Sequence, residues 1–214
     1  MILVTGGSAS GKSAFAERLA VEYQKGPKLY IATMKPYDAE CEARIRKHRL
    51  MRCDKGFETE ECYGLTLENT YAGKYHDRIG LFECMSNYLS NCMFEDNYEI
   101  DDAEMTAGDK YRKLTEQMVS ELTRLDEVLG QLIVVTNEVF SDGIHYDPVT
   151  TQYLHCLGQC NRMLAEKAEE VYEVICGIAV RRKSKEKDGR ENENDFQSIC
   201  NCFFHVFKNT DAPD

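Results

Sequence analysis

Short runs of apolar residues alternate along the chain with segments whose apolar positions recur at helical spacing. The apolar runs predict strands at 2–4, 29–32, 79–82, 132–135 and 171–180. Gly177 interrupts the last of these runs. The periodic segments predict helices at 11–22, 39–52, 86–94 and 111–129. Strands separated by helices are typical of an α/β fold, with a mostly parallel sheet that helices cover on both faces.

The two longest helical patterns differ in polarity. Segment 39–52 carries charged residues on most of its faces, so we expect an exposed helix there. Segment 111–129 instead repeats apolar residues on one face, which predicts a stripe buried in the core. That stripe consists of Leu114, Met118, Leu122, Leu125 and Leu129.

Two polar stretches interrupt the α/β pattern. Residues 95–109, EDNYEIDDAEMTAGD, are strongly acidic and predict an exposed, mobile loop. Residues 183–195, KSKEKDGRENEND, are too polar to bury themselves and are typical of a linker. The following FQSICNCFFHVF is apolar enough to dock on the body or on a partner. We therefore expect one domain over 1–182, with 183–214 as a polar linker and a short apolar tail.

The charge and composition of the chain limit the kinds of binding partner that we expect. The chain has 214 residues and a formal net charge of −11, which argues against bulk attraction to nucleic acid or to an anionic membrane. No apolar run approaches about 18 residues, so no integral membrane segment is expected. The ten cysteines form no paired knuckles, and no secretory signal precedes them. We expect a cytoplasmic protein with reduced, mostly buried cysteines, in which any anion is bound by a local basic cluster.

The stretch MILVTGGSASGKS contains a complete Walker A pattern, GxxxxGKS. The glycines allow a tight loop whose N–H groups face phosphates, and the helix that follows adds the positive end of its dipole. The lysine reaches phosphate oxygens, and the serine hydroxyl can ligate Mg²⁺. A chance glycine-rich turn is the alternative, but the position between a strand and a helix favours nucleotide binding. The predicted nucleotide loop is Gly6, Gly7, Ser8, Ala9, Ser10, Gly11, Lys12 and Ser13.

Polar residues follow several predicted strands. Glu83 ends the third strand and is a candidate to hold Mg²⁺ together with Ser13. The alternative is a carboxylate that stabilises the N-terminus of the next helix. Thr5, Thr33 and Asn137 end other strands, so all four side chains should lie along the edge of the sheet where ligands bind.

A single histidine lies among cations in ARIRKHRLMR. Helical spacing places Arg44, His48 and Arg52 on one face. Nearby positive charge favours the neutral imidazole, which is a nucleophile, and the same cations would bind a triphosphate. Taken alone, this segment is more typical of a solvated basic helix whose histidine has no catalytic role. The other histidines, His76, His145, His155 and His205, are expected at the surface or in packing roles.

Several motifs occur in an order that resembles one enzyme family. They are ILVTGGSASGKS, LYIAT, ARIRKHR, ECMSNYLSN, VVTNEV and GQCNRMLAEKAEEVYEVICGIAV. The chain resembles the bifunctional adenosylcobinamide kinase/adenosylcobinamide-phosphate guanylyltransferases from residue 1 to about 182. The RIxxHR segment and the VTNEV strand end are more particular to that family than the Walker A motif, which many families share.

The resemblance implies a RecA-like P-loop fold and two reactions. The first phosphorylates adenosylcobinamide with ATP or GTP, and the second transfers GMP from GTP to adenosylcobinamide phosphate, releasing pyrophosphate. It implies that His48 carries GMP as a covalent intermediate, that Mg²⁺ accompanies the nucleotides, and that the enzyme is a homo-oligomer, trimeric in the best-known case. The further nucleotide contacts that it implies are Thr33, Met34, Lys35, Arg49, Leu50, Met51, Arg52, Glu61 and Glu83.

The chain departs from the family pattern after the fourth predicted strand. The family tends to have EVGxGIVP there, whereas this chain has EVFSDGIHYDP, with Phe140 in place of a glycine and a longer loop. Phe57 also stands where tryptophan is common. These changes leave two alternatives open: a P-loop kinase with one activity and a changed acceptor, or a GTP-binding regulatory protein. The intact Lys12, Ser13 and His48 favour the enzyme.

Overall fold

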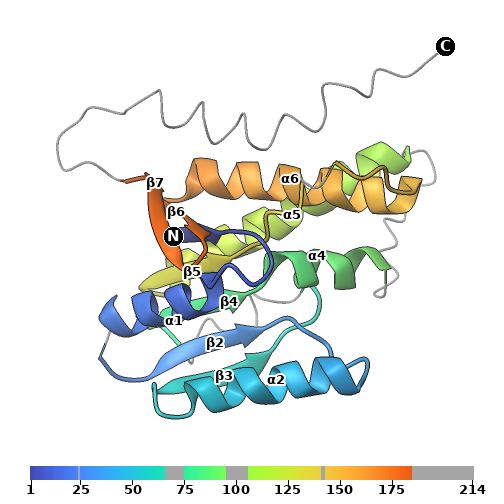
Figure 1. Ribbon diagram of the computed structural model, residues 1–214. Helices are drawn as coiled ribbons and strands as arrows, with labels where there is room; N and C mark the ends of the chain where they lie inside the picture. Colours follow the sequence, from blue (N-terminus) through green and yellow to red (C-terminus); the bar gives the residue numbers. More distant parts are fainter. Residues whose placement is uncertain (24, 66–74, 95–105, 141–142, 185–214) are drawn as a thin grey trace.

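The computed structural model describes residues 1–23, 25–65, 75–94, 106–140 and 143–184. Seven strands form one sheet in the order β3-β2-β4-β5-β1-β6-β7 (Figure 1). The first six strands run parallel, and β7 pairs antiparallel with β6. The strands are β1 (Ile2–Thr5), β2 (Lys28–Ala32), β3 (Phe57–Glu61), β4 (Ile79–Glu83), β5 (Gln131–Val135), β6 (Glu170–Ile175) and β7 (Ile178–Lys183). The predicted α/β class and mostly parallel sheet are confirmed.

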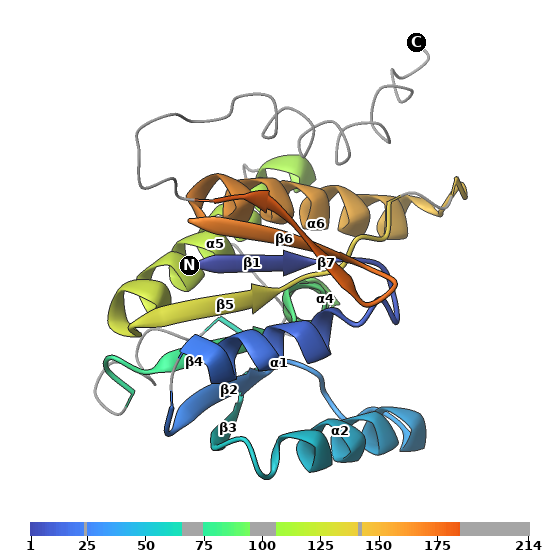
Figure 2. The ribbon, with the colours of Figure 1, turned by 60° about the vertical axis from the view of Figure 1, so that its left-hand side comes forward.

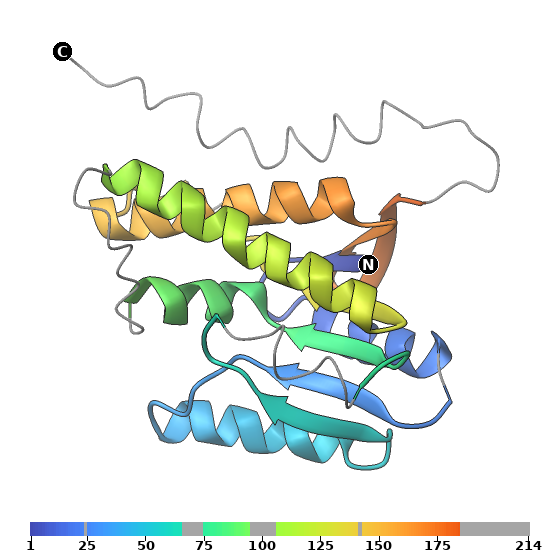
Figure 3. The same cartoon turned by 180° about the vertical axis from the view of Figure 1, so that it is seen from behind.

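Helices cover both faces of this sheet. The described helices are α1 (Lys12–Tyr23), α2 (Ala39–Arg52), α4 (Met85–Phe94), α5 (Ala107–Val128) and α6 (Pro148–Lys167). One apolar cluster joins α1 to the sheet through Ala16 and Leu19, and a second joins α4, α5 and α6 to the other face. Figures 2 and 3 show these two sides, with α1 in front of the sheet in one view and α5 and α6 over it in the other. The helix α2 lies beside the β3 edge (Figure 1).

The predicted apolar stripe of the longest helix is buried as expected. Leu114, Met118, Leu122, Leu125 and Leu129 are each at most 2% exposed. They pack against α4, α6 and the apolar residues of the sheet. The helix begins earlier than predicted because the Thr106 hydroxyl accepts a hydrogen bond from the Asp109 N–H and caps it. The predicted loop 95–109 therefore ends in a helical turn, and its first eleven residues lie outside the described residues.

The predicted strand 171–180 is two strands. The main chain turns at Cys176 and Gly177, which both have positive φ, and β7 returns beside β6. A left-handed residue pair is the geometry that a tight hairpin requires, so the glycine ends one strand and starts another.

Two elements were absent from the sequence prediction. Strand β3 has the polar sequence FETEE, because it forms the edge of the sheet and exposes most of its side chains. Helix α6 begins where Asp147 accepts hydrogen bonds from the Val149 and Thr150 N–H groups, with Pro148 in the first turn. An aspartate followed by proline is a recognised start signal for a helix, so this element was readable from the sequence.

The remaining predictions about chain organisation are met in part. All eight described cysteines are free, and five of them are buried. No helix within the described ranges combines the length and hydrophobicity needed to span a bilayer. The appended segment 183–214 lies almost entirely outside the described residues, so the docking of its apolar tail stays a prediction.

The packing of α5 makes a stability prediction. Replacing Leu122, which is fully buried, with alanine should lower the free energy of unfolding by about 2–5 kcal/mol, through lost burial and the cavity left behind. Urea unfolding followed by circular dichroism measures this. The exposed Ser120 on the same helix supplies the control, and Ser120→Ala should change stability by less than about 0.5 kcal/mol. Equal losses in the two variants would contradict the assigned core face.

Candidate functional site

The glycine-rich loop connects β1 to α1, as its motif predicted. A Cβ on Gly6 would lie 2.5 Å from the Val174 carbonyl oxygen, so this position has no room for a side chain. Gly11 has a φ of +91°, in the left-handed region that glycine adopts without strain. The Gly177 N–H donates to the Ser10 carbonyl at 2.8 Å, so the β6–β7 turn holds the loop from one side. The loop is thus fixed by the neighbouring strands.

Lys12 lies at the start of α1 and reaches back over the loop. Its Nζ donates to the Gly7 carbonyl at 3.0 Å. Burial lowers the pKa of this ammonium, while the nearby Cys84 and Glu83 oppose the shift. An anion bound at the loop would favour the charged lysine in the same way, so the site suits a phosphate group. Ser13 follows on the first turn of the helix and is half-buried.

The predicted row of polar residues at the carboxyl ends of the strands is present. The Thr33 hydroxyl donates to the Cys84 carbonyl at 2.8 Å and accepts from the Cys84 N–H at 2.6 Å. The Asn137 amide donates to the Ser86 hydroxyl at 2.6 Å. Thr33 is fully buried, so its side chain fixes the ends of β2 and β4 and is not presented at the surface.

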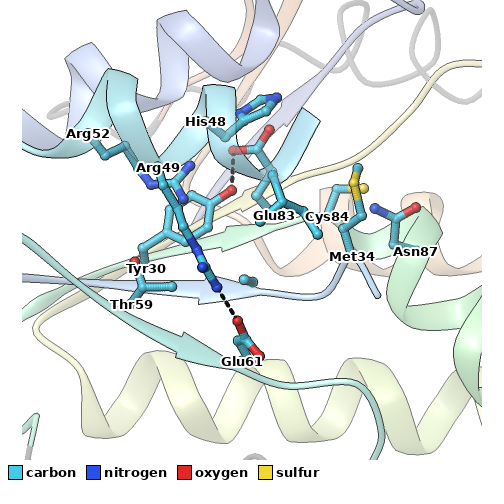
Figure 4. A pocket seen from close by; sticks show the side chains of 12 residues that line it. Tyr30, Met34, His48, Arg49, Arg52, Thr59, Glu61, Glu83, Cys84 and Asn87 are labelled. Carbon is cyan, nitrogen blue, oxygen red and sulfur yellow. Dashed lines mark hydrogen bonds and ion pairs between the residues drawn. The ribbon is translucent and has the colours of Figure 1, made fainter. Parts of the chain in front are cut away.

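His48 lies in a small pocket of about 60 Å³ between α2 and the ends of β2, β3 and β4. Its half-buried ring points toward Glu83, whose carboxylate lies beside it in Figure 4. The imidazole, Glu83 and Glu17 each offer a ligand atom within 4.8 Å of the other two. His48 Nδ1 is buried and has no hydrogen-bond partner within the described part of the chain. The sequence analysis placed cations around this histidine, and folding adds two carboxylates to them.

Arg52 forms a buried part of the wall of this pocket. The side chain is about 95% buried, and its guanidinium lies 3.4 Å from the centre of the Tyr30 ring. The Tyr30 hydroxyl donates to Glu83 at 3.0 Å. Burial raises the pKa of Tyr30 and the Glu83 carboxylate raises it further, so the phenol stays protonated and keeps donating. Among the described residues, Arg52 Nε has no hydrogen-bond partner and Nη1 faces only the Glu17 carboxylate, at 3.9 Å, so the guanidinium keeps donors for an anion in the pocket.

Glu17 joins the two helices of the site and was not singled out from the sequence. It is fully buried on α1, one turn beyond the loop residue Ser13. Its Oε2 accepts from Lys55 Nζ at 2.5 Å, and its Oε1 lies 3.9 Å from Arg52 Nη1. A glutamate among the apolar residues of an amphipathic helix is the one signal that could have identified it.

Only some of the other predicted nucleotide-binding residues lie in the His48 pocket. Arg49, Glu61 and Met34 line the His48 pocket, and Arg49 pairs with Glu61. Leu50 is 74% exposed and is not part of the pocket lining. Lys35 lies over the Tyr63 ring, 5.6 Å from its centre. The main chain places Met51 between Leu50 and Arg52 on the last turn of α2.

The donor chemistry distinguishes two candidate cation sites. Glu17, His48 and Glu83 could ligate an ion, but Lys55 and Arg52 beside Glu17 already neutralise this cluster and would repel a dication. The Ser13 hydroxyl and the Glu83 carboxylate are hard oxygen donors of the kind that Mg²⁺ prefers. In donor type, Ser13 and Glu83 therefore suit magnesium better than the mixed cluster around His48 does.

Comparison of the sequence with known protein families finds one family that matches this chain. The profile described as cobinamide kinase / cobinamide phosphate guanyltransferase, CobU, matches residues 2–182. The chain is similar to the bifunctional adenosylcobalamin biosynthesis protein CobU of Escherichia coli, with 31% identity over 86% of this chain and 99% of that protein. It is also similar to CobP of Pseudomonas aeruginosa, with 29% identity over 86% and 97% of the two chains.

Solved structures show a weaker likeness. The flagellar accessory protein FlaH of Methanocaldococcus jannaschii aligns with 86% of this chain and 77% of its own, at 13% identity and a TM-score of 0.40. An ATPase of a bacterial type III secretion system aligns with 94% of this chain and 61% of its own, at 9% identity and a TM-score of 0.44. The sheet order and the loop geometry described above are more informative than either likeness.

The buried position of Glu17 yields a second stability prediction. Glu17→Gln removes the charge that faces Lys55 and the buried Arg52, so we expect a loss of about 3–5 kcal/mol in the free energy of unfolding. Urea unfolding of Glu22→Gln, at an exposed position of the same helix, is the matched control and should stay within about 0.5 kcal/mol of the parent. If Glu17→Gln left the free energy of unfolding unchanged, the carboxylate would not be what holds α1 and α2 together.

Proposed function

The chain belongs to the cobinamide kinase / cobinamide phosphate guanyltransferase family, and from this premise we propose how its residues divide the two reactions. The first reaction phosphorylates the alcohol of adenosylcobinamide with ATP or GTP. The second transfers GMP from GTP to adenosylcobinamide phosphate, giving adenosylcobinamide-GDP and pyrophosphate. The observation that carries the proposal is Glu83, which lies near both Lys12 of the loop and His48 of α2.

The loop supports the kinase step. Residues 6–13 bind the triphosphate through main-chain N–H groups at the start of α1, and Lys12 neutralises the phosphate that is transferred. The acceptor hydroxyl attacks the γ-phosphorus, the bond from that phosphorus to the bridging β-phosphate oxygen breaks, ADP or GDP leaves, and the hydroxyl proton passes to solvent. Ser13 and Glu83 would hold Mg²⁺ with the nucleotide. The ion supplies charge neutralisation on the phosphate oxygens when it is bound.

The pocket around His48 supports the guanylyl step. A neutral imidazole nitrogen attacks the α-phosphorus of GTP, the bond to the β-phosphate breaks, and pyrophosphate leaves. Arg52 and Arg49 bind the charged phosphates that pass through the pocket. An oxygen of adenosylcobinamide phosphate then attacks the same phosphorus, the P–N bond breaks, and His48 is restored. Glu83 and Glu17 stand where they can orient the ring and hold its proton.

Phe140 bears on the alternative of a kinase with a changed acceptor. The phenylalanine is 4% exposed and packs in the apolar cluster beneath α6. It therefore replaces the family's glycine by filling the core and does not block the site. This favours the bifunctional enzyme over a single-activity kinase or a regulatory GTP-binding protein. Residence in the cytoplasm and assembly into a homo-oligomer, trimeric by resemblance, stay predictions.

A labelling experiment tests the covalent step. Protein incubated with Mg²⁺ and GTP labelled at the α-phosphate, then quenched in denaturant, should carry one label that is labile in acid and stable in base. A phosphorus–nitrogen bond has this stability. His48→Ala should reduce the label at least a hundredfold, because the nucleophile is gone.

His76 supplies the control for this experiment. It is exposed in the segment before β4, so His76→Ala should be labelled like the parent protein. Label retained on the His48→Ala variant would show that His48 is not the nucleophile. A parent protein without label that still phosphorylates adenosylcobinamide would instead support the single-activity kinase.

A further inference from the structure

A second hollow lies beside the nucleotide loop, and the roles proposed above for the loop and for His48 do not assign it a ligand. It has a volume of about 620 Å³ and opens between the starts of α4 and α6. Ser8 of the nucleotide loop forms one wall, Ser86 and Asn87 form another, and Tyr153 of α6 closes the far side. We call this hollow the anterior groove. A ligand in it would face the phosphate that a nucleotide on the loop presents for transfer.

The floor of the anterior groove is polar and rigid. The Asn137 amide donates to the Ser86 hydroxyl, and the Tyr153 hydroxyl donates to the Ser86 carbonyl at 3.2 Å. These bonds tie the end of β5, the start of α4 and the face of α6 to one another. Side-chain amides and hydroxyls of this kind pair with the amide and hydroxyl groups of a neutral ligand.

The charge of the anterior groove contrasts with that of the His48 pocket. No lysine or arginine occurs among the described residues that line the groove, and Glu138 is its one ionisable carboxylate. The His48 pocket instead contains Arg49 and Arg52. A phosphate would therefore favour the pocket, and an uncharged alcohol would favour the groove.

Exposed apolar residues lie in the segment that carries Tyr146, one of the residues that line the anterior groove. Ile144 is 62% exposed, Tyr146 39% and Val149 57%, all within six residues of chain. Figure 2 shows this segment projecting past the carboxyl ends of the strands as it leads into α6. Exposed apolar side chains grouped beside a polar hollow are typical of a binding surface for a ligand too large to enter. We call Ile144, Tyr146 and Val149 the rim.

We propose that the anterior groove and its rim form the acceptor site, an assignment that rests on the proposed function. The amide-linked alcohol arm of the corrinoid enters the groove and places its hydroxyl before Ser8 and the transferable phosphate. The macrocycle stays outside, with its apolar face on the rim. Asn87 lines both the groove and the His48 pocket, so the phosphorylated arm reaches the arginines and the GMP on His48 without leaving the protein.

Equilibrium dialysis with adenosylcobinamide tests the assignment without requiring turnover. Val149→Asp and Ile144→Asp place a charge on the rim at exposed positions, and each should weaken binding about tenfold or more. Val21→Asp is the matched control: it is an exposed valine near the far end of α1, and its affinity should equal that of the parent. Tyr146→Ala adds a variant that removes contact area without adding charge, and a smaller loss is expected.

The outcomes separate this inference from the proposed function. Equal affinity in both rim variants and the parent, or a parent protein that does not bind adenosylcobinamide, would overturn the acceptor site. The GMP label on His48 needs no acceptor, so its presence or absence tests the nucleotidyl chemistry alone. A parent that binds adenosylcobinamide through the rim but forms no label keeps the groove and refutes the covalent mechanism.

Discussion

The carboxylate of Glu17 is buried where α1 meets α2, and a charge in that position must be neutralised by its neighbours. Arg52 ends α2 and Lys55 lies three residues beyond it, so the charge fixes the end of that helix against the helix that starts at the nucleotide loop. His48 lies one turn before Arg52. Its distance from the loop therefore depends on the ion pairs of Glu17, which join the two helices.

Two hollows of opposite character meet at Asn87. One contains arginines and a histidine, and the other contains amides, hydroxyls and an apolar rim. This division matches a reaction sequence in which a neutral acceptor becomes an anion and is then consumed as one. Under the proposed function Glu83 would serve both halves, because it lies near Lys12 on one side and accepts from Tyr30 beside His48 on the other. Both proposed reactions would then use one edge of the sheet.

Sequence patterns predicted the elements whose local sequence alone determines their conformation. The loop at Gly6–Ser13 and the stripe through Leu122 follow from spacing alone, since a glycine-rich turn and an amphipathic helix carry their own geometry. Strand β3 was missed because an edge strand need not be apolar. The Glu17 carboxylate beside His48 was not predicted for a related reason: Glu17 is distant in sequence, and only the packing of α1 on α2 brings it near. The anterior groove is likewise made by four separate segments.

The antiparallel return of β7 settles the direction in which the chain leaves the sheet. Because β7 runs against the six parallel strands, Lys183 lies near the start of β6, at the edge opposite the loop and both hollows. Its ammonium donates to the Ala165 and Glu166 carbonyls and anchors the strand end to the last turn of α6. A surface tether attached at Ser184, the last described residue, would thus hold the protein on the side away from the site and leave the site facing the solution.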